Sequence, residues 1–373
     1  MQSCDVLVIG GGIAGASAAH ELAADRTVVV LEQESQPGYH ATGRSAALFR
    51  ESYPHPTTRA LAAASRDFLE RPPAGFGDHP LLSPRGALLI ARADRAAMLD
   101  DMAAELRTRG LVVEPCDEAA ARRLVPVLRA GTVAAALYEP GACDVDVNAL
   151  HQGYLRGLRA RGGRLIADAA AERIERRGGR WRIAVGDEVF SAPILVNAAG
   201  AWADAVAALA GVAPLGLMPL RRTAVTFDPP PSIEVSGWPM VLDAGGAFYF
   251  KPEGGRLLAS PADETPSPPT DAQPDEYDVA LAIDRIEAAT EITVRRVVSR
   301  WAGLRTFAPD RAPVAGFDPG AEGFFWLAGQ GGTGVVTAPA LARLTAALIA
   351  GRSDAALAGP GLNESALGPA RLR

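Results

Sequence analysis

The N-terminal stretch constrains the fold more than any other part of the chain. A short apolar run, residues 5–9, leads directly into the glycine turn at residues 10–15. A helical stretch, residues 16–24, follows, and a second β-branched run, residues 27–31, ends on Glu32. Strand, glycine turn, helix, strand and terminal acid in this order are typical of a dinucleotide-binding unit. The complete context favours a bound dinucleotide over a purely structural turn.

Each part of this stretch has a physical role in holding a dinucleotide. Gly10 permits the tight turn, Gly12 lets the backbone approach a pyrophosphate, and Gly15 lets the helix pack against the strand. The N-terminus of the helix supplies free N–H groups and a partial positive charge for the phosphates. Glu32, about 20 residues after the turn, is expected to accept hydrogen bonds from a ribose diol.

Length and composition limit the classes of protein to consider. A chain of 373 residues is long for one core and indicates two domains. The net charge of −6 shows no basic surplus for binding nucleic acid. No uninterrupted apolar run reaches the roughly 20 residues that span a bilayer, so no integral membrane segment is expected.

Cysteine and histidine usage adds two expectations. The 3 cysteines are scattered and form no CxxC pair, which indicates a reducing compartment and a cytoplasmic protein without disulfides. No cluster of potential ligands indicates a metal site. His55, His79 and His151 are interpreted as structural residues rather than catalytic bases.

The order of elements predicts an α/β (α+β) fold with interleaved domains. A Rossmann-like dinucleotide-binding domain is expected from residues 1–80, 145–215 and 301–373. An antiparallel β-sheet substrate domain is expected from residues 81–144 and 216–300. Periodicity and capping predict helices near 94–109, 118–124, 147–161, 202–209, 277–289 and 335–349, with a further short helix opening at 42–47. Residues 240–243, 247–251 and 256–260 are expected to form a β-meander.

Two further stretches resemble the N-terminal turn, because small residues follow a predicted strand in each. Small residues at the end of a predicted strand, 196–202, leave room for a bulky planar group against the backbone. A second glycine turn, residues 331–334, stands between a predicted strand and a long helix. It places another helix N-terminus, with its partial positive charge, at a second position. Both stretches favour contact with a cofactor over simple tight packing.

Taken together, these motifs resemble the FAD-dependent D-amino-acid oxidase and glycine oxidase superfamily. The resemblance also includes residues 42–45, 301–305 and 309–316, covers essentially the whole chain, and is closest to the D-arginine dehydrogenases. It implies an amino-acid substrate, hydride transfer from Cα to flavin N5, and hydrolysis of the imine to a 2-oxo acid and ammonia. Either oxygen or a quinone is implied as the electron acceptor.

The resemblance also implies which residues hold the FAD. No cysteine matches the position of covalent attachment in sarcosine-oxidase relatives, so the FAD is expected to be non-covalent. The implied cofactor-binding residues are Gly10, Gly12, Ile13, Ala14, Gly15, Glu32, Gln33, Ala41, Thr42, Gly43, Arg44, Ser45, Ala46, Ala47, Leu48, Ala171, Ala199, Gly200, Trp202, Gly303, Arg305, Gly331, Gly332, Thr333, Gly334, Val335 and Val336.

Four residues match the family's catalytic positions. Arg222 and Arg305 correspond to the carboxylate-binding arginines, whose planar fork pairs bidentately with a carboxylate. Tyr53 and Tyr249 correspond to the active-site tyrosines, and a lid role is also open for Tyr53. Because side chains alternate along a strand, Arg221 must face away from the side that Arg222 faces.

The substrate pocket departs from the D-arginine dehydrogenase pattern. Ala87 stands where a glutamate binds the cationic side chain, and Leu48 and Arg50 replace a histidine and a threonine. Arginine and lysine side chains are therefore poor candidates. An inward Arg50 predicts a second carboxylate on the substrate, whereas an outward Arg50 predicts a neutral pocket, which is slightly favoured. The remaining pocket candidates are Met240, Leu242, Gly332 and Thr333.

These residues lead to one preferred function and several alternatives. The preferred function is oxidative deamination of a D-amino acid. Oxidation of an N-substituted amino acid or a 2-hydroxy acid is an alternative, although a hydroxy acid generally needs a base and the pocket has lost a histidine. A non-catalytic flavin-binding protein is the third possibility, and the retained arginines and tyrosines argue against it.

Overall fold

The computed structural model describes residues 1–77, 79–231, 233–353 and 364–373. Its nucleotide-binding half is built on a six-stranded sheet whose neighbouring strands are parallel except at one edge. In spatial order the strands are β10 (Arg164–Ile166), β3 (Val28–Leu31), β2 (Val6–Ile9), β14 (Ile194–Asn197), β22 (Phe324–Ala328) and β21 (Val314–Phe317).

Helices cover one face of this sheet. α1 (Ile13–Leu22), α2 (Pro56–Glu70), α5 (Val147–Ala160) and α8 (Gly334–Ile349) contribute to a common core with the valines of β2 and β3. Alternate residues of the same strands face the opposite side, because successive side chains of a strand point to opposite faces. Burial on both faces explains why β2 and β3 are apolar throughout.

The opposite face is covered by a smaller sheet and a short helix. The smaller sheet has four strands, in the order β1 (Gln2–Ser3), β13 (Glu188–Ala192), β12 (Arg180–Val185) and β11 (Arg173–Arg177). Together with α6 (Ala203–Leu209) it buries Leu7, Leu195 and Trp326. The nucleotide-binding half therefore consists of three layers.

A ten-stranded sheet forms the other half. Its path runs β23 (Gln330–Gly331), β20 (Val297–Phe307), β15 (Met218–Phe227), β18 (Arg256–Ser260), β17 (Tyr249–Glu253), β16 (Met240–Asp243), β6 (Ala87–Ala91), β8 (Ala135–Glu139) and β7 (Glu114–Cys116), with β19 (Thr265–Pro266) beside β15. The expected meander, β16 to β18, is confirmed. The antiparallel pairing expected for this half is found between all neighbouring strands of the path except β6 and β16, which pair in parallel.

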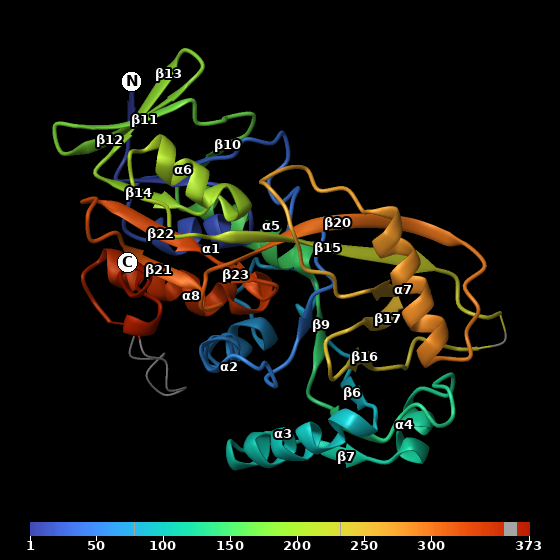
Figure 1. Ribbon diagram of the computed structural model, residues 1–373. Helices are drawn as coiled ribbons and strands as arrows, with labels where there is room; N and C mark the ends of the chain where they lie inside the picture. Colours follow the sequence, from blue (N-terminus) through green and yellow to red (C-terminus); the bar gives the residue numbers. More distant parts are fainter. Residues whose placement is uncertain (78, 232, 354–363) are drawn as a thin grey trace.

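Helices cover the two faces of the large sheet unequally. α7 (Glu276–Ala289) and α4 (Glu118–Leu124) bury one face, and α3 (Ala96–Thr108) packs on the other near its outer end (Figure 1). Asp117 and Asp146 cap α4 and α5 by accepting from Ala120 N and Ala149 N, each at 2.7 Å. The uncovered part of the second face is turned toward the nucleotide-binding half.

The two halves are joined by long strands. β15 and β20 pair antiparallel along almost their whole length and run from one half to the other (Figure 1). A small sheet of β4 (Leu48–Phe49), β9 (Cys143–Val145) and β5 (Leu82–Pro84) makes a second link. β20 spans the expected domain boundary at residue 301 and β23 lies beyond it, because the large sheet continues past that residue.

The predicted helix at residues 42–47 is wrong. These residues form a turn that leads into β4, which pairs with β9. The hydroxyl oxygen of Thr42 accepts from Ile13 N at 3.0 Å, so the turn is tied to the start of α1. Short 3₁₀ helices occupy Ala93–Arg95, Gly200–Trp202, Glu364–Ala366 and Pro369–Leu372. Among the described residues, no helix is both long and apolar enough to cross a membrane.

Candidate active site

The glycine turn between β2 and α1 is as tight as its sequence indicates. Gly10 has a φ of +102°, and a Cβ there would lie 2.5 Å from the carbonyl oxygen of Ala198. A Cβ on Gly15 would lie 1.9 Å from the carbonyl oxygen of Gly10. Glycine is required at both positions, since any side chain would separate helix and strand. The start of α1 thereby lies close to the ends of β2 and β14.

Glu32 is fixed at the end of β3. Its carboxylate accepts from Gly11 N at 2.6 Å and from Glu34 N at 2.9 Å, and the residue is 7% exposed. It also lines a long cavity that passes over the glycine turn. A carboxylate oriented by two backbone donors retains lone pairs for further hydrogen bonds.

This first cavity gathers most of the residues expected to hold the cofactor. It runs along the carboxyl ends of β2, β3 and β14, where α/β folds bind nucleotides. Its lining includes Gly10, Gly12, Ile13, Ala14, Glu32, Gln33, Ala41, Thr42, Arg44, Ser45, Ala46, Ala171, Ala199, Gly200, Trp202, Gly303, Arg305, Gly331, Gly332, Gly334 and Val335. Ala47, Leu48 and Val336 line the second cavity instead.

Three of the expected cofactor residues line neither cavity: Gly15, Gly43 and Thr333. Gly15 acts through packing, as described above. Gly43 N donates to the carbonyl of Gly38 at 2.8 Å and closes a turn. The Thr333 hydroxyl donates to the carbonyl of Gln330 at 2.9 Å, immediately before α8. All three therefore shape the backbone around the cavity rather than its surface.

The sequence reasoning missed other residues of the first cavity. Ala205, Val206 and Leu209 on one side of α6 line it, as does His40. His40 stacks at a tilt on Trp202, with ring centroids 4.6 Å apart, and lies 2.8 Å from Glu34. The sequence held no signal for the α6 residues, because their position depends on how α6 docks on the six-stranded sheet; the exposure of Leu209, at 40%, is seen only in the structure.

A second cavity, of about 590 Å³, opens from the end of the first. It lies between the large sheet and the segment from β4 to the start of α2. The two cavities share Arg222, Arg305, Tyr249, Gly332 and Val335, together with Ser45 and Ala46. The shared residues mark the junction, and its size suits a small molecule.

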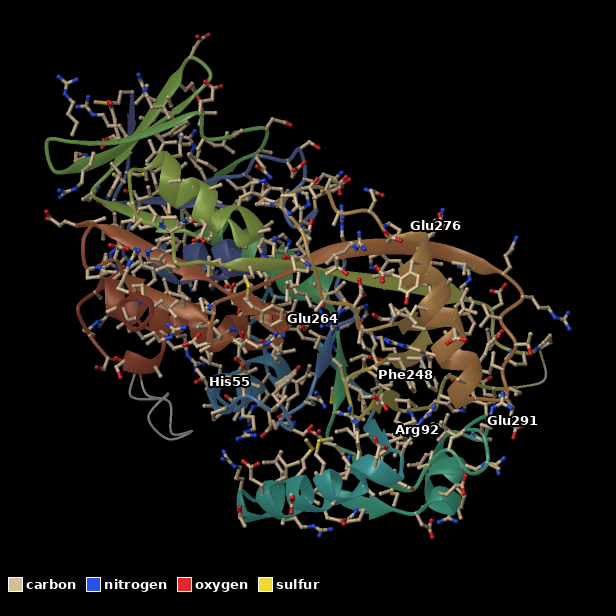
Figure 2. The ribbon with its side chains drawn as sticks, in the orientation of Figure 1. His55, Arg92, Phe248, Glu264, Glu276 and Glu291 are labelled. Carbon is tan, nitrogen blue, oxygen red and sulfur yellow. The ribbon has the colours of Figure 1, made fainter. Side chains whose placement is uncertain are left out.

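Arg222 lies at this junction on β15. Its Nε donates to the carbonyl of Asp263 at 2.7 Å, and its Nη2 lies 3.2 Å from Glu264 Oε1. Figure 2 shows Glu264 near the middle of the molecule, between its two halves. Burial lowers the pKa of Arg222, and the charge of Arg305 lowers it further. Arg221 pairs with Asp278 at 2.7 Å under α7, so the predicted alternation of the two arginines is confirmed.

Tyr249 and Arg305 lie together at the junction. Arg305 Nη2 donates to the Tyr249 hydroxyl oxygen at 3.4 Å. Burial alone would raise the pKa of Tyr249, but the charges of Arg305 and Arg222 outweigh it and lower the pKa. Phe250 enters the core under α7, on the opposite face of β17, and Phe248, just before β17, contributes to the same core while also lining the second cavity. The site therefore presents two guanidinium groups and a phenol to one small volume.

Tyr53 lines only the second cavity. Its hydroxyl donates to the carbonyl of Leu48 at 2.9 Å, and burial raises its pKa to about 12. The phenol thus stays neutral at ordinary pH and braces the loop between β4 and α2.

Arg50 faces the second cavity, which differs from the slightly favoured expectation of an outward side chain. Its Cζ lies 5.0 Å from the centre of the Tyr53 ring. The neighbouring Glu51 pairs instead with Arg66, away from Arg50. The sequence pattern could not distinguish these directions, because the loop conformation is set by contacts with β8.

The other pocket candidates divide into two groups. Met240, Leu242 and Gly332 line the second cavity, as do the unpredicted residues Ser52, Leu89, Met102, Asp243 and Glu264. Ala87 does not line it: the residue is fully buried in a cluster with Leu48, Met240 and Tyr249. Leu89 shares a strand face with Ala87 and reaches the cavity, a relation that strand alternation would have indicated.

No histidine of the described residues lines either the second cavity or the junction. His151 is buried, and its Nε2 lies 2.8 Å from the carbonyl oxygen of Gly11. Within the described ranges, no group of three or more His, Cys, Asp or Glu side chains is arranged to hold a metal ion.

The fold and the two joined cavities are those of a flavoprotein, with a dinucleotide-binding cavity that leads into a cavity for a small molecule. The DAO family of FAD-dependent oxidoreductases matches residues 5–348. The chain therefore belongs to that family and is an FAD-dependent oxidoreductase. The glycine-lined first cavity, with an oriented acid at its end, fits FAD, which confirms the cofactor expected from the sequence.

Individual relatives agree with this assignment. The glycine oxidase of Pseudomonas aeruginosa is 30% identical over 373 residues, covering 93% of this chain and 95% of that enzyme. The structure of L-proline dehydrogenase from P. horikoshii matches with a TM-score of 0.86 at 22% identity, over 99% of this chain and 98% of that one. The structure of iminodiacetate oxidase from a Chelativorans species matches with a TM-score of 0.79 at 24% identity, over 98% of each chain.

Proposed function

We propose that the protein oxidatively deaminates a D-amino acid. The observation that carries this proposal is the convergence of Arg222, Arg305 and Tyr249 at the junction of the two cavities. Two arginines at one point suit an α-carboxylate, since guanidinium and carboxylate pair in a planar, bidentate geometry. A carboxylate held there would have its Cα near the end of the cofactor cavity.

The first cavity offers three sets of groups for FAD. Gly10, Gly12 and the N-terminus of α1 would hold the pyrophosphate, and Glu32 would hold the ribose. The N-terminus of α8, beside Gly332, would hold the end of the flavin ring with its partial positive charge. FAD, when bound, supplies the acceptor for the Cα hydride.

The protein's own residues then act chiefly by positioning. Arg222 and Arg305 hold the carboxylate, and Tyr249 adds a hydrogen bond to it, so that Cα is oriented. Hydride transfer from an oriented Cα needs no strong base. Leu48, Met240 and Leu242 line the volume for the side chain and limit access of water. The imine product leaves and hydrolyses to a 2-oxo acid and ammonia.

The side chain of the substrate is proposed not to be cationic. Arg50 would repel a guanidinium or an ammonium group in the second cavity. Glu264 is already paired with Arg222 and Arg311. D-arginine and D-lysine therefore rank low among the candidates.

A second candidate is oxidation of an N-substituted amino acid. It is favoured by the similarity to an enzyme named iminodiacetate oxidase, because iminodiacetate is an N-substituted glycine. The same arginines would hold the carboxylate, and the second cavity would take the N-substituent. A 2-hydroxy acid ranks below both, because the second cavity has no histidine among its described lining residues to accept the hydroxyl proton.

The deciding experiment is an anaerobic screen in which the holoenzyme is mixed with D- and L-amino acids, N-methyl amino acids and 2-hydroxy acids. Bleaching of the flavin by D-amino acids is expected, with the corresponding 2-oxo acid and ammonia as products. Faster bleaching by N-methyl compounds would favour the second candidate. No bleaching by any compound would favour a non-catalytic flavoprotein. Reoxidation of the bleached enzyme by oxygen and by a quinone then identifies the acceptor.

A further inference from the structure

Arg50 is a cation at the wall of the second cavity, outside the junction. It follows β4, and its Nη1 donates to the hydroxyl oxygen of Ser52 at 3.4 Å. Its guanidinium also lies over the ring of Tyr53. A neutral hydroxyl and an aromatic face orient a guanidinium without neutralising it. The side chain is thus directed to the cavity by its own loop.

A buried carboxylate fixes this loop. Glu139 at the end of β8 is 4% exposed, and its Oε1 accepts from Glu51 N at 2.8 Å. Its Oε2 accepts from the hydroxyl of Ser52. Both oxygens of Glu139 therefore bind the loop rather than Arg50. The direction of Arg50 is determined by a part of the large sheet, which makes it a built feature of the cavity.

The acids that line the cavity have partners other than Arg50 among the described residues. The acids of the lining are Glu264 and Asp243. Glu264 pairs with Arg222 and with Arg311, and Asp243 Oδ2 accepts from Ala247 N at 3.0 Å. Among the residues that the structure describes, no carboxylate forms an ion pair with Arg50. A partly buried cation of this kind is stabilised by an anion that enters with a ligand.

We propose that the substrate carries a second carboxylate on its side chain and that Arg50 binds it. This inference rests on the proposed function, in which Arg222 and Arg305 hold the α-carboxylate at the junction. Arg50 lines only the second cavity, whereas the other two arginines line both. Two carboxylates on one molecule would therefore bind to different arginines. The apolar walls at Leu48 and Leu242 suit the methylene groups between them.

The first test measures binding without turnover. The holoenzyme is titrated with glutarate and with butyrate, which differ by one carboxylate, and binding is followed by the visible spectrum of the flavin. Glutarate is expected to bind about 10-fold more tightly or better. In Arg50→Gln the ratio of the two Kd values falls to about 1, and in Arg50→Lys it is intermediate. Equal Kd values in the wild type, or an unchanged ratio in Arg50→Gln, would overturn the proposal.

A matched control removes an arginine elsewhere. Arg71 is a solvent-exposed residue after α2 and pairs with Asp67 on the surface. The Arg71→Gln variant is expected to keep the wild-type ratio of Kd values. If this variant lowered the ratio as far as Arg50→Gln, the effect would be one of general surface charge and the proposal would fail.

The second test separates this inference from the proposed function. Anaerobic bleaching by D-glutamate and D-aspartate is compared with bleaching by their amides, D-glutamine and D-asparagine. Faster bleaching by the acids in the wild type, with loss of that preference in Arg50→Gln, supports the inference. Bleaching by the amides at an equal or higher rate overturns it and leaves the proposed function standing. If no amino acid bleaches the flavin, the proposed function fails, while the glutarate titration still tests Arg50.

Discussion

The Nη2 atom of Arg305 lies 3.4 Å from the hydroxyl oxygen of Tyr249, where the two cavities meet. Both residues are held at this junction, since their strands, β20 and β17, belong to the same sheet. The positive charges of Arg305 and Arg222 favour the phenolate and lower the pKa of Tyr249. The affinity of this site for anions is therefore linked to the ionisation of one tyrosine.

Binding of a monocarboxylate is expected to weaken as the pH rises through the pKa of Tyr249. The neutral phenol donates to a carboxylate, whereas the phenolate repels it, so the loss occurs on the alkaline side and below the ordinary tyrosine pKa. Tyr249→Phe is expected to abolish this alkaline limb and to weaken binding at neutral pH about 5-fold. Titration of the flavin spectrum with butyrate between neutral and alkaline pH checks both effects. If butyrate binding still weakened at alkaline pH in Tyr249→Phe, another ionising group would be responsible.

Arg222 and Arg221 form a natural pair of test positions, because they are neighbours on opposite faces of β15. Arg222→Met is expected to raise the Kd for butyrate and the KM for substrate by roughly 10- to 100-fold, as charge-assisted hydrogen bonds are lost. Arg221→Met is expected to leave both constants within about 2-fold and to lower only stability, since Arg221 pairs with Asp278 under α7. Equal effects on Kd would contradict the assignment of Arg222 to the carboxylate.

Gly15→Ala is expected to reduce retention of FAD. The new Cβ would lie 1.9 Å from the carbonyl oxygen of Gly10, so α1 must move away from β2, at a cost of about 1–3 kcal/mol. The flavin-to-protein ratio after gel filtration and the thermal midpoint both report this change. Gly237→Ala is the control, because a Cβ at Gly237 has no atom within 4 Å. A flavin content as high as that of the control would show that α1 does not need its close approach.

Acid destabilisation is expected to depend on His20 in α1. Burial lowers the pKa of His20 to about 4, and its Nδ1 has no hydrogen-bond partner. In the unfolded chain the pKa is about 6.5, so the unfolded state binds the extra proton first as pH falls. The contribution of neutral His20 to the free energy of unfolding is fully present above about pH 6.5 and is lost as the pH falls toward 4. The loss is about 2 kcal/mol at pH 5.

The variant His20→Leu should lose this part of the acid sensitivity. Free energies of unfolding of the two proteins, measured by urea titration at pH 7.5 and pH 5, provide the comparison. His79→Leu is the control, because His79 is solvent-exposed, lines neither cavity and lies outside the core around α1. A wild-type protein equally stable at both pH values would contradict the buried neutral state of His20.

Non-covalent attachment of the flavin is a further expectation. The free cysteines are Cys4, Cys116 and Cys143, and none of them lines either cavity. Burial raises the pKa of the Cys4 thiol to about 11, which further lowers its reactivity. Precipitation with trichloroacetic acid is therefore expected to leave a colourless pellet and a yellow supernatant. A yellow pellet would indicate a covalent bond.

Local patterns predicted the parts of the site that depend on local geometry. The turn at Gly10 and Gly15 follows from the steric needs of one βαβ unit, and strand alternation correctly separated Arg221 from Arg222. Tyr249 likewise lies opposite Phe250. These predictions needed only the fixed period of a strand and the freedom of glycine.

Long-range contacts determined what the sequence could not indicate. The direction of Arg50 depends on Glu139, which belongs to a distant strand, and no local period connects the two. Ala87 was expected in the pocket, but Leu48 and Met240 cover it. The contribution of α6 to the first cavity depends on how a short helix docks on the six-stranded sheet. Residues 42–47 form a turn rather than a helix, because the residues that follow them, Leu48 and Phe49, pair with β9.

The paired strands β15 and β20 have a consequence for the kinetics of the protein. A hinge between the halves would have to break or bend a ladder that runs from Met218 to Phe227, and domain rotations of this kind take microseconds to milliseconds. The short loop that carries Arg50 and Tyr53 is held by side-chain contacts from Glu139, Arg59 and Arg66 and is not part of that ladder. Loop motions take nanoseconds to microseconds. Exchange of substrate and product is therefore expected on the faster of these two timescales, through the loop, while the cofactor half and the sheet stay in one arrangement.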